Sequence, residues 1–367
     1  RGIVSWAASG GESMTVKWIK KKKGEKPLNI TQAVTSVTWG GSVQEAARTA
    51  EISVASAPED KNIKSLKLNI GAGDTIKLYE NGELLFLGEV QASRKTGETG
   101  TVSYSCYDLL NHLLRSTGVY NFKNTTAERI TEKVCADLGI KTGSITATKV
   151  LLKKMIFDGD TFYDIIMKAY TKAAKQTGKK YICRMDGTKL SVQIKGEKVK
   201  GFVLQEGYNI TNASYEETIE NMVNIVKIYN DKNKQAGVVK NEKHIEKYGI
   251  YQETYKKEDG VNAATAAKSL LNGIEKKINV EGINGDLDCI AGNGVKIRDK
   301  TTGLNGLFWI ENDTHTWENG IHTMSLELSF KNIMDSKEYE EEKTKKTKKD
   351  KEDKKDKKNK GEKVAHN

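Results

Sequence analysis

Proline is almost absent from this chain of 367 residues, which has only two. That scarcity excludes Pro-rich linkers and collagen-like or mucin-like stalks, whereas the 33 glycines suit many turns between strands. No apolar run approaches the ~20 residues of a membrane span, and no continuous apolar core marks a secretory signal. We therefore expect a soluble protein that is made in the cytoplasm and has no membrane partner.

The cysteines lack the spacing of a metal site. Cys106, Cys135, Cys183 and Cys289 are far apart, and no Cys-x-x-Cys pair occurs, whereas zinc ligands usually come in close pairs. We interpret them as free, buried thiols in a reducing compartment. Their spacing alone leaves disulfides open as the alternative.

Recognisable catalytic motifs are also missing. The sequence has no His-Glu-x-x-His, no Gly-x-Ser-x-Gly and no P-loop. His315 and His322 fall on or beside adjacent expected strands, and we interpret them as surface histidines. Nothing places the carboxylates Glu216–Glu217, Asp286 and Asp288 around a cleft, so we interpret them as solvated turns and strand edges. We predict no catalytic, cofactor-binding or metal-binding residue, and a protein that is not an enzyme.

The net charge of +11 would by itself suggest a nucleic-acid binder. Residues 335–367 contribute +3 from 13 Lys and 10 acidic residues, which leaves a mildly basic +8 on the other 334 residues. A nucleic-acid binder usually clusters its basic residues on one element, and the only dense cluster outside the mixed-charge segment 335–367 is the short run Lys20–Lys23. Trp18 beside that run is interpreted as part of a solvated edge strand. We expect no specific nucleic-acid binding.

Hydrophobic periodicity and turn residues divide the chain into parts. The expected parts are a leader or cloning remnant (1–13), a first antiparallel β-domain, barrel or sandwich (14–106), an α+β domain (107–205), a second β-domain in two pieces (206–230 and 285–334), a helical insert between those pieces (231–284), and a charged, disordered tail (335–367). Helices are expected over Tyr107–Arg115, after the capping-box pattern Thr125-x-x-Glu128, from Asp160, and between Ala263 and Ile278. The tail lacks apolar residues to bury, and it is either a tether for a partner or a solubilising end.

The two β-regions resemble each other in one order along the chain. The matched segments are Asn29–Ala33 with Asn209–Ala213, Ala50–Val54 with Asn224–Ile228 in apolar pattern only, Ile76–Leu78 with Val295–Ile297, Leu85–Phe86 with Leu307–Phe308, and Gly100–Ser105 with Gly320–Ser325. Each match is weak alone, but their common order predicts a duplicated β-domain whose second copy is split by an insert.

Several segments carry a resemblance to a known family. They are VTSVTWGGS (34–42), GDTIKLYENGELLFLGEV (73–90), SCYDLLNHLLRS (105–116), GDTFYDIIMKA (159–169), QTGKKYICRMDGTKLSV (176–192), ENMVNIVKIY (220–229), THTW (314–317) and NGIHTMSLELSFKNIMD (319–335). The chain resembles the baseplate hub proteins of PBSX-like defective prophages and of related contractile-tail bacteriocins (tailocins).

The resemblance implies an α+β, mainly β fold with two similar β-barrel tube domains. It implies a structural hub of a phage tail or bacteriocin particle: a homotrimer whose six barrels form a pseudo-sixfold ring. The implied partners are a hexameric tail tube protein, a trimeric spike protein and other baseplate proteins. It implies no cofactor and no catalytic residue. Barrel edge strands are expected to make the ring contacts through main-chain hydrogen bonds, although the sequence names no interface residue. The alternatives are a tail-associated cell-wall hydrolase and a basic nucleic-acid-binding β-protein.

Overall fold

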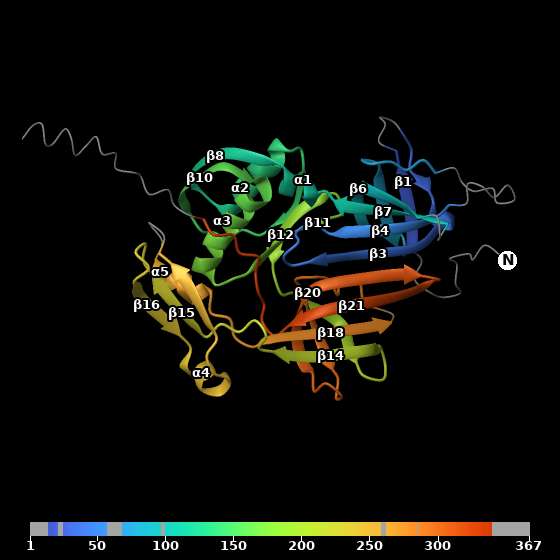
Figure 1. Cartoon of the computed structure of the whole chain (residues 1–367). Coiled ribbons are helices and arrows are strands. Elements are labelled where there is room, and N and C mark those ends of the chain that lie inside the picture. The colour runs from blue at the N-terminus through green and yellow to red at the C-terminus, as the bar shows by residue number, and fades with distance from the viewer. Residues whose placement is uncertain are drawn as a thin grey trace, which may run out of the picture.

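A computed structural model describes residues 14–20, 25–56, 68–96, 100–257, 262–283 and 285–339. Two β-barrels, an α+β domain and a smaller insert make up the molecule (Figure 1). The predicted fold class, mainly β with two similar barrels and inserted α+β parts, is confirmed. The expected leader over residues 1–13 lies outside the described residues.

Six strands form the first barrel, in the order β3–β4–β7–β6–β5–β1. Their bounds are β1 Met14–Ile19, β3 Val34–Ser42, β4 Thr49–Ala55, β5 Thr75–Glu80, β6 Glu83–Thr96 and β7 Thr101–Asp108; β2 (Leu28–Asn29) pairs with β1, and a short 3-10 helix spans Thr31–Ala33. Alternate side chains point inward, so that Val37, Ile52 and Leu78 are buried in one core. The predicted hairpin turn at Asn81–Gly82 joins β5 to β6, with positive φ at both residues.

The second barrel repeats this arrangement as β14–β18–β21–β20–β19–β13. Its strands are β13 Lys198–Gln205, β14 Ile210–Thr218, β18 Glu275–Ile283, β19 Gly294–Arg298, β20 Asn305–Glu318 and β21 Ile321–Ser329. Every pair is antiparallel except β13–β19. The buried inner side chains include Val280, Val295 and Leu326.

The two barrels also share the positions of two bulges. In the first barrel the register shifts after Val34 between β3 and β4, and after Val90 between β6 and β7. In the second it shifts after Ile210 between β14 and β18, and after Ile310 between β20 and β21. A bulge adds an unpaired residue at one defined place in a ladder, so the shared bulges align the copies residue by residue. The predicted duplication is therefore present.

Some of the segments matched in sequence take equivalent positions in the two barrels, and others do not. Ile76–Leu78 and Val295–Ile297 take equivalent positions in β5 and β19. The match of Ala50–Val54 to Asn224–Ile228 was wrong, because β18 occupies the place of β4 in the second barrel. The other three matches lie on or next to equivalent strands but are displaced along them.

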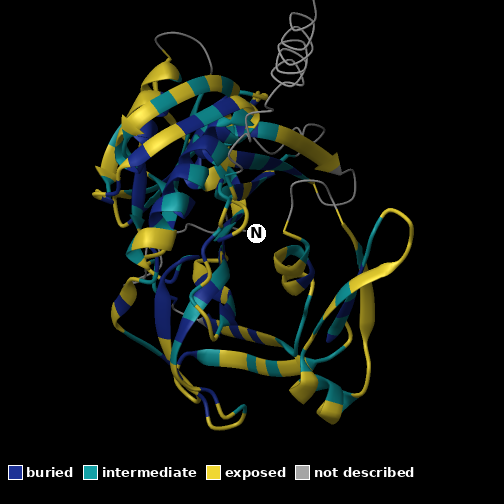
Figure 2. Ribbon diagram, turned by 90° about the vertical axis from the view of Figure 1, so that its left-hand side faces the viewer, coloured by how far each residue is buried: buried dark blue, intermediate teal, exposed yellow. Residues whose placement is uncertain are grey.

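The α+β domain packs three helices against two small sheets. Its elements are α1 Leu110–Arg115, β8 Thr117–Thr125, α2 Ala127–Asp137, β9 Lys141–Ile145, β10 Leu152–Thr161, α3 Phe162–Thr177, β11 Tyr181–Asp186 and β12 Lys189–Ile194. Strands β8 and β10 pair, and β11, β12 and β9 form the other sheet. Helix α3 is the buried centre (Figure 2). It starts where predicted, with the Thr161 side chain accepting a hydrogen bond from Asp164 N, and ends at Gly178 in the left-handed conformation.

Two details of this domain differ from expectation. The capping-box prediction at Thr125 was wrong, because α2 begins one residue later and Glu128 binds Thr148 instead. Residues 198–205 form β13, which pairs with β19 of the second barrel. We therefore propose that the α+β domain ends before β13.

The insert is mixed, so the expectation of a helical segment over 231–284 was wrong. It contains a three-stranded sheet of β16 Gln235–Lys240, β15 Ile225–Tyr229 and β17 Gln252–Lys256, with α4 Glu242–Tyr248 and α5 Ala263–Ser269. Because β15 pairs with these strands and not with the second barrel, we propose that the insert begins before β15, inside the predicted β-domain piece 206–230. The helix predicted up to Ile278 ends earlier, because Ile278 and Val280 are alternate inner residues of strand β18. The insert has a small core of its own, in which Val226, Ile228 and Ala267 are fully buried or nearly so.

After β21 the chain returns across the α+β domain. Met334 is buried in the core of that domain, the Tyr163 hydroxyl donates to Asp335 at 2.9 Å, and Ile156 N donates to the Tyr339 hydroxyl at 2.7 Å. The predicted disordered tail therefore does not begin at residue 335, since residues 335–339 are packed. The rest of the predicted tail, 340–367, lies outside the described residues.

Met334 anchors this return segment, so its truncation tests the packing. We expect Met334→Ala to lower the free energy of unfolding by about 2 kcal/mol, through lost burial and the cavity left behind. The neighbouring Ile333 is half exposed, and Ile333→Ala should leave stability almost unchanged. Urea unfolding of both variants makes the comparison, and equal losses would contradict the packing.

Candidate functional site: the seam between the two barrels

Strand β20 of the second barrel pairs with β3 of the first, and this pairing is the seam between the two barrels. The first part of β20 pairs with β19, and beyond the bulge Asn312–Glu318 pairs antiparallel with Ser36–Ser42 of β3. The two barrels thereby share one continuous thirteen-stranded sheet (Figure 1). The strands are close at Gly40, where an added Cβ would lie 2.5 Å from the carbonyl oxygen of Asp313. The close approach of β3 and β20 at this point therefore requires glycine at position 40.

A buried ion pair bridges the seam beneath the sheet. The Arg48 guanidinium donates to both Asp313 carboxylate oxygens, at 2.9 and 2.5 Å, and lies 3.9 Å from the ring centroid of Trp39. Ala291 N donates to the same carboxylate at 2.6 Å. Because the side chain of Asp313 is 0% exposed and that of Arg48 11%, the pair is shielded from water. It fixes the loop before β4 to strand β20 of the other barrel.

Two histidines extend this buried network, so their interpretation as surface residues was wrong. His315 Nε2 lies 3.2 Å from the Cys289 carbonyl, and His315 Nδ1 lies 3.0 Å from His322 Nε2. The carbonyl can only accept, so Nε2 of His315 carries the proton and Nδ1 accepts from His322. The His322 ring stacks on Trp317 with centroids 4.4 Å apart. Burial lowers the pKa of His315 to about 4, which keeps the imidazole neutral at pH 7.

The pKa of His315 implies a pH dependence of stability. The unfolded chain binds this proton below about pH 6.5 and the folded chain only below about pH 4, so His315 destabilises the fold as pH falls through that window. Relative to His315→Gln, we expect the wild type to lose up to about 1.4 kcal/mol per pH unit between these values. Burial raises the pKa of Asp108 to about 7, which acts in the opposite sense, but this contribution is common to both proteins. Urea unfolding at several pH values tests this, and a constant difference would contradict it.

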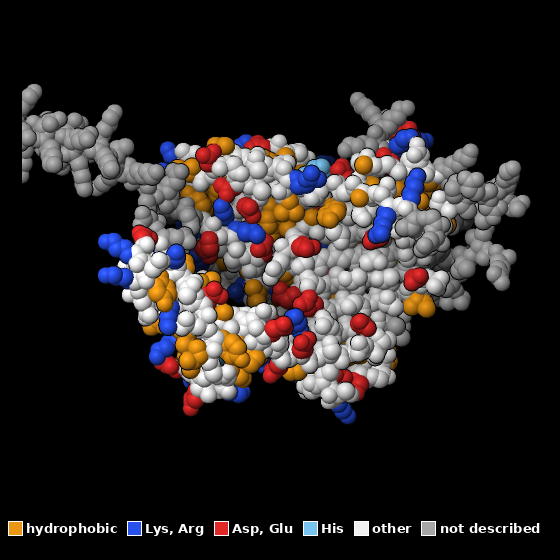
Figure 3. Space-filling view, in the orientation of Figure 1, with side chains coloured by type: hydrophobic (Ala, Val, Ile, Leu, Met, Phe, Trp, Pro, Cys, Tyr) orange, Lys and Arg blue, Asp and Glu red, His pale blue; other side chains and the backbone are white. Residues whose placement is uncertain are grey.

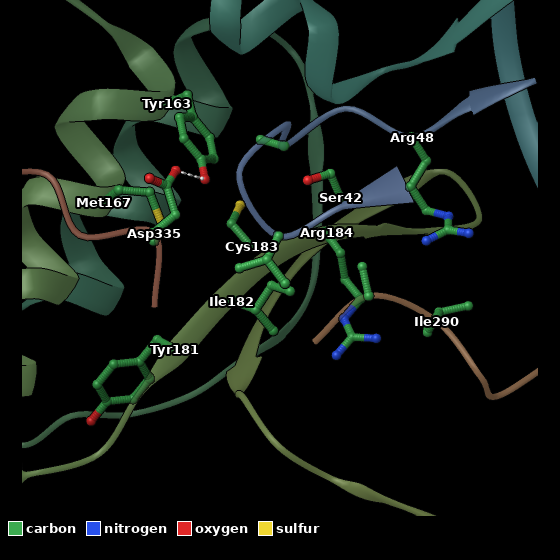
Figure 4. A pocket seen from close by; sticks show the side chains of 13 residues that line it. Ser42, Arg48, Tyr163, Met167, Tyr181, Ile182, Cys183, Arg184, Ile290 and Asp335 are labelled. Atoms are coloured by element: carbon green, nitrogen blue, oxygen red, sulfur yellow. Dashed lines mark hydrogen bonds between the residues drawn. The ribbon is translucent and has the colours of Figure 1, made fainter. Parts of the chain in front are cut away.

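The α+β domain is attached close to the seam. Arg184 of β11 donates to the side-chain oxygen of Asn293 at 3.2 Å, and the fully buried Lys195 Nζ lies 3.5 Å from Glu311 of β20. Burial lowers the pKa of Lys195, against the attraction of Glu311. Figure 4 shows the small cavity at this junction, with Arg48 and Arg184 among its lining side chains. The cavity of about 20 Å³ has room for roughly one water molecule.

The cysteines and the paired carboxylates do not form a reactive site in the described structure. All four cysteines are free and buried, as predicted, and burial raises the pKa of Cys106 to about 12 and of Cys135 to about 11. Glu216 and Glu217 are exposed on edge strand β14, and Asp286 and Asp288 lie in a turn before β19.

Trp18 differs from its interpretation as a solvated edge residue. Its indole nitrogen donates to Asp74 at 3.0 Å, and the ring packs partly buried against the first core. Within the described ranges, no three His, Cys, Asp or Glu residues gather in a way that would hold a metal ion. No helix among these residues is long and apolar enough to cross a bilayer.

A family profile described as YQBQ-like matches residues 37–329. This range includes the seam, most of both barrels, the α+β domain and the insert. The chain belongs to the YQBQ-like family. Among its relatives, the phage-like element PBSX protein XkdQ of Bacillus subtilis is 28% identical over 309 residues, which are 82% of this chain and 93% of XkdQ. The uncharacterized protein YqbQ of the same organism is 28% identical over 273 residues, or 72% of this chain and 83% of YqbQ.

Solved structures share the fold of this YQBQ-like protein. The 43 kDa tail protein of prophage MuSo2 from Shewanella oneidensis has a TM-score of 0.65 at 16% identity, covering 87% of this chain and 97% of its own. A tail protein from Neisseria meningitidis MC58 has a TM-score of 0.60 at 16% identity, with coverage of 90% and 100%. The YQBQ-like protein thus has the fold of these phage tail proteins, and the predicted resemblance to PBSX-like prophage proteins is confirmed.

Sequence reasoning missed the ion pair at the seam. Arg48 precedes β4 in a loop, and no motif links it to Asp313, which is 265 residues away. One signal was available: Asp313, His315 and Trp317 alternate along one strand, which places polar groups on its inner face. Buried polar groups require partners, so this alternation predicts a buried polar network on that face.

Proposed function

We propose that this YQBQ-like protein is the structural baseplate hub of a contractile phage tail or tailocin. In this proposal three copies form a ring of six barrels, which joins a hexameric tail tube to a trimeric spike. The observation that carries the proposal is the duplication: two barrels of one strand order joined side by side by a continuous sheet. A protomer with two equivalent barrels presents six similar units in a threefold ring, and so fits partners of either symmetry.

The seam suits a part that bears mechanical load. Main-chain pairing over Ser36–Ser42 and the ion pair between Arg48 and Asp313 hold the barrels in one orientation. Ion pairs that are shielded from water tolerate little displacement, because separating the charges leaves each one buried without a partner. The hub would accordingly pass force from tube to spike as a rigid body.

Deletion of the chain from a tail-forming prophage tests the function. We expect particles without it to lack spikes and attached baseplates, and re-expression of the full chain to restore them. Electron microscopy of the wild-type particle should place the chain between tube and spike. Spiked, complete particles assembled in its absence would contradict the proposal.

A further inference from the structure

The seam has a counterpart within the first barrel that has no partner in the described part of the chain. Strand β6 is equivalent to β20, and both run past a bulge, after Val90 and Ile310 respectively. Beyond its bulge β20 pairs with β3 on the side away from β21. On the same side of β6, the segment Ala92–Lys95 pairs with none of the described strands and is exposed. An exposed, regular strand edge is a template for pairing with another strand.

The second barrel holds the complementary edge. Strand β14 is equivalent to β3, yet within the described ranges its ladder is only with β18, so it stands at the end of the sheet. The shared bulges align Val34 with Ile210 and Trp39 with Tyr215. A second parallel supports this alignment: Arg48 lies over the ring of Trp39 and Lys276 over the ring of Tyr215.

We propose that β6 of one copy pairs with β14 of the next, in the register that β20 and β3 use inside the chain. Glu216 takes the place of Gly40 in this alignment, so the two strands must lie farther apart at that point than β20 and β3 do. Transferring that register sets Ser93 opposite Glu217, Arg94 opposite Glu216, and Lys95 opposite Tyr215. This contact rests on the proposed ring. The ring would then have three seams within chains and three seams in the same register between chains. A contact between two different patches of one chain closes into a ring when its rotation divides the circle.

The charges on the two edges complement each other. Arg94 and Lys95 are exposed and adjacent on β6, whereas Glu216 and Glu217 are exposed and adjacent on β14. Glu217 already binds Lys276 at 2.7 Å, but Glu216 has no ion pair among the described residues. Figure 3 shows acidic side chains gathered over the end of the second barrel that borders the insert. Opposite charges directly across an antiparallel pair are favourable, and like charges are unfavourable.

Cross-linking of the purified full-length chain tests the register. In the variant Arg94→Cys/Glu216→Cys, a short bismaleimide should link copies into covalent dimers and trimers, because the native cysteines are all buried. The matched control Arg94→Cys/Asn212→Cys moves one thiol about 13 Å along the same exposed face of β14, and should give little product. Thr38→Cys/Thr316→Cys, across the internal seam, should link within one chain.

Charge exchange adds an independent readout. We expect Arg94→Glu and Glu216→Arg each to raise the concentration at which the trimer dissociates by about tenfold, and the double variant to restore it. A trimeric mass with cross-linking equal in the 216 and 212 pairs would overturn the proposed register and leave the hub standing. A chain that stays monomeric and gives no intermolecular product would overturn both.

Discussion

Asp313→Ala is expected to lower the free energy of unfolding by about 3–5 kcal/mol. The substitution leaves the Arg48 guanidinium buried against Trp39 without its carboxylate, and removes the acceptor of Ala291 N. Breaking a buried ion pair by removing one partner has this size of effect because the remaining charge is uncompensated. Urea unfolding followed by tryptophan fluorescence, at one fixed protein concentration, measures the loss.

A double substitution separates the buried charge from the shape of the site. In Arg48→Met/Asp313→Leu neither charge remains, and we expect at least half of the lost stability to return. Asp137→Asn is the exposed control, since Asp137 pairs with Lys133 on the surface of α2, and it should leave unfolding almost unchanged. A loss below about 1 kcal/mol in Asp313→Ala would contradict the structural role given to the pair.

Gly40→Ala is expected to cost about 3 kcal/mol, the upper part of the range for overpacking. The added Cβ would lie 2.5 Å from the backbone oxygen of Asp313. Backbone cannot rotate away as a flexible side chain can, so β3 and β20 must separate. Thermal unfolding would record the loss, and limited proteolysis should reveal faster cleavage near the seam.

The matched control for this substitution is Gly71→Ala. A Cβ at position 71 has only one neighbour within 4 Å, Asp74 Oδ2 at 4.0 Å, and Gly71 does not have the left-handed φ that favours glycine. We expect this variant to match the wild type in stability. Equal tolerance of alanine at positions 40 and 71 would show that the strands at the seam are not held as closely as described.

Local patterns predicted the parts of the fold that depend on near neighbours. The hairpin at Asn81–Gly82 and the start of α3 at Asp160–Thr161 depend on backbone preferences of a few residues, and both are as predicted. The prediction of a helix up to Ile278 was wrong. The apolar spacing there fits both a helix and a strand, and the segment is a strand because it pairs with the distant β21. Tertiary pairing overrides local preference in such segments.

The candidate site depended on such distant pairings. The histidines were predicted to lie on or beside adjacent strands as surface residues. His315 does contact His322, but both are buried, because β3 and the Cys289 segment cover β20. The duplication was visible in sequence, yet the residue alignment came from bulges, which leave no sequence signal of their own. The ring contacts could be named only after that alignment.

The mass of the native full-length chain tests the central claim most directly, because a ring of six barrels needs three copies. Light scattering across a range of concentrations should give three times the 40.8 kDa of one chain, and dilution should convert trimer to monomer in one step. A mass that stays at one chain, even at high concentration and with the tail tube protein added, would contradict the ring.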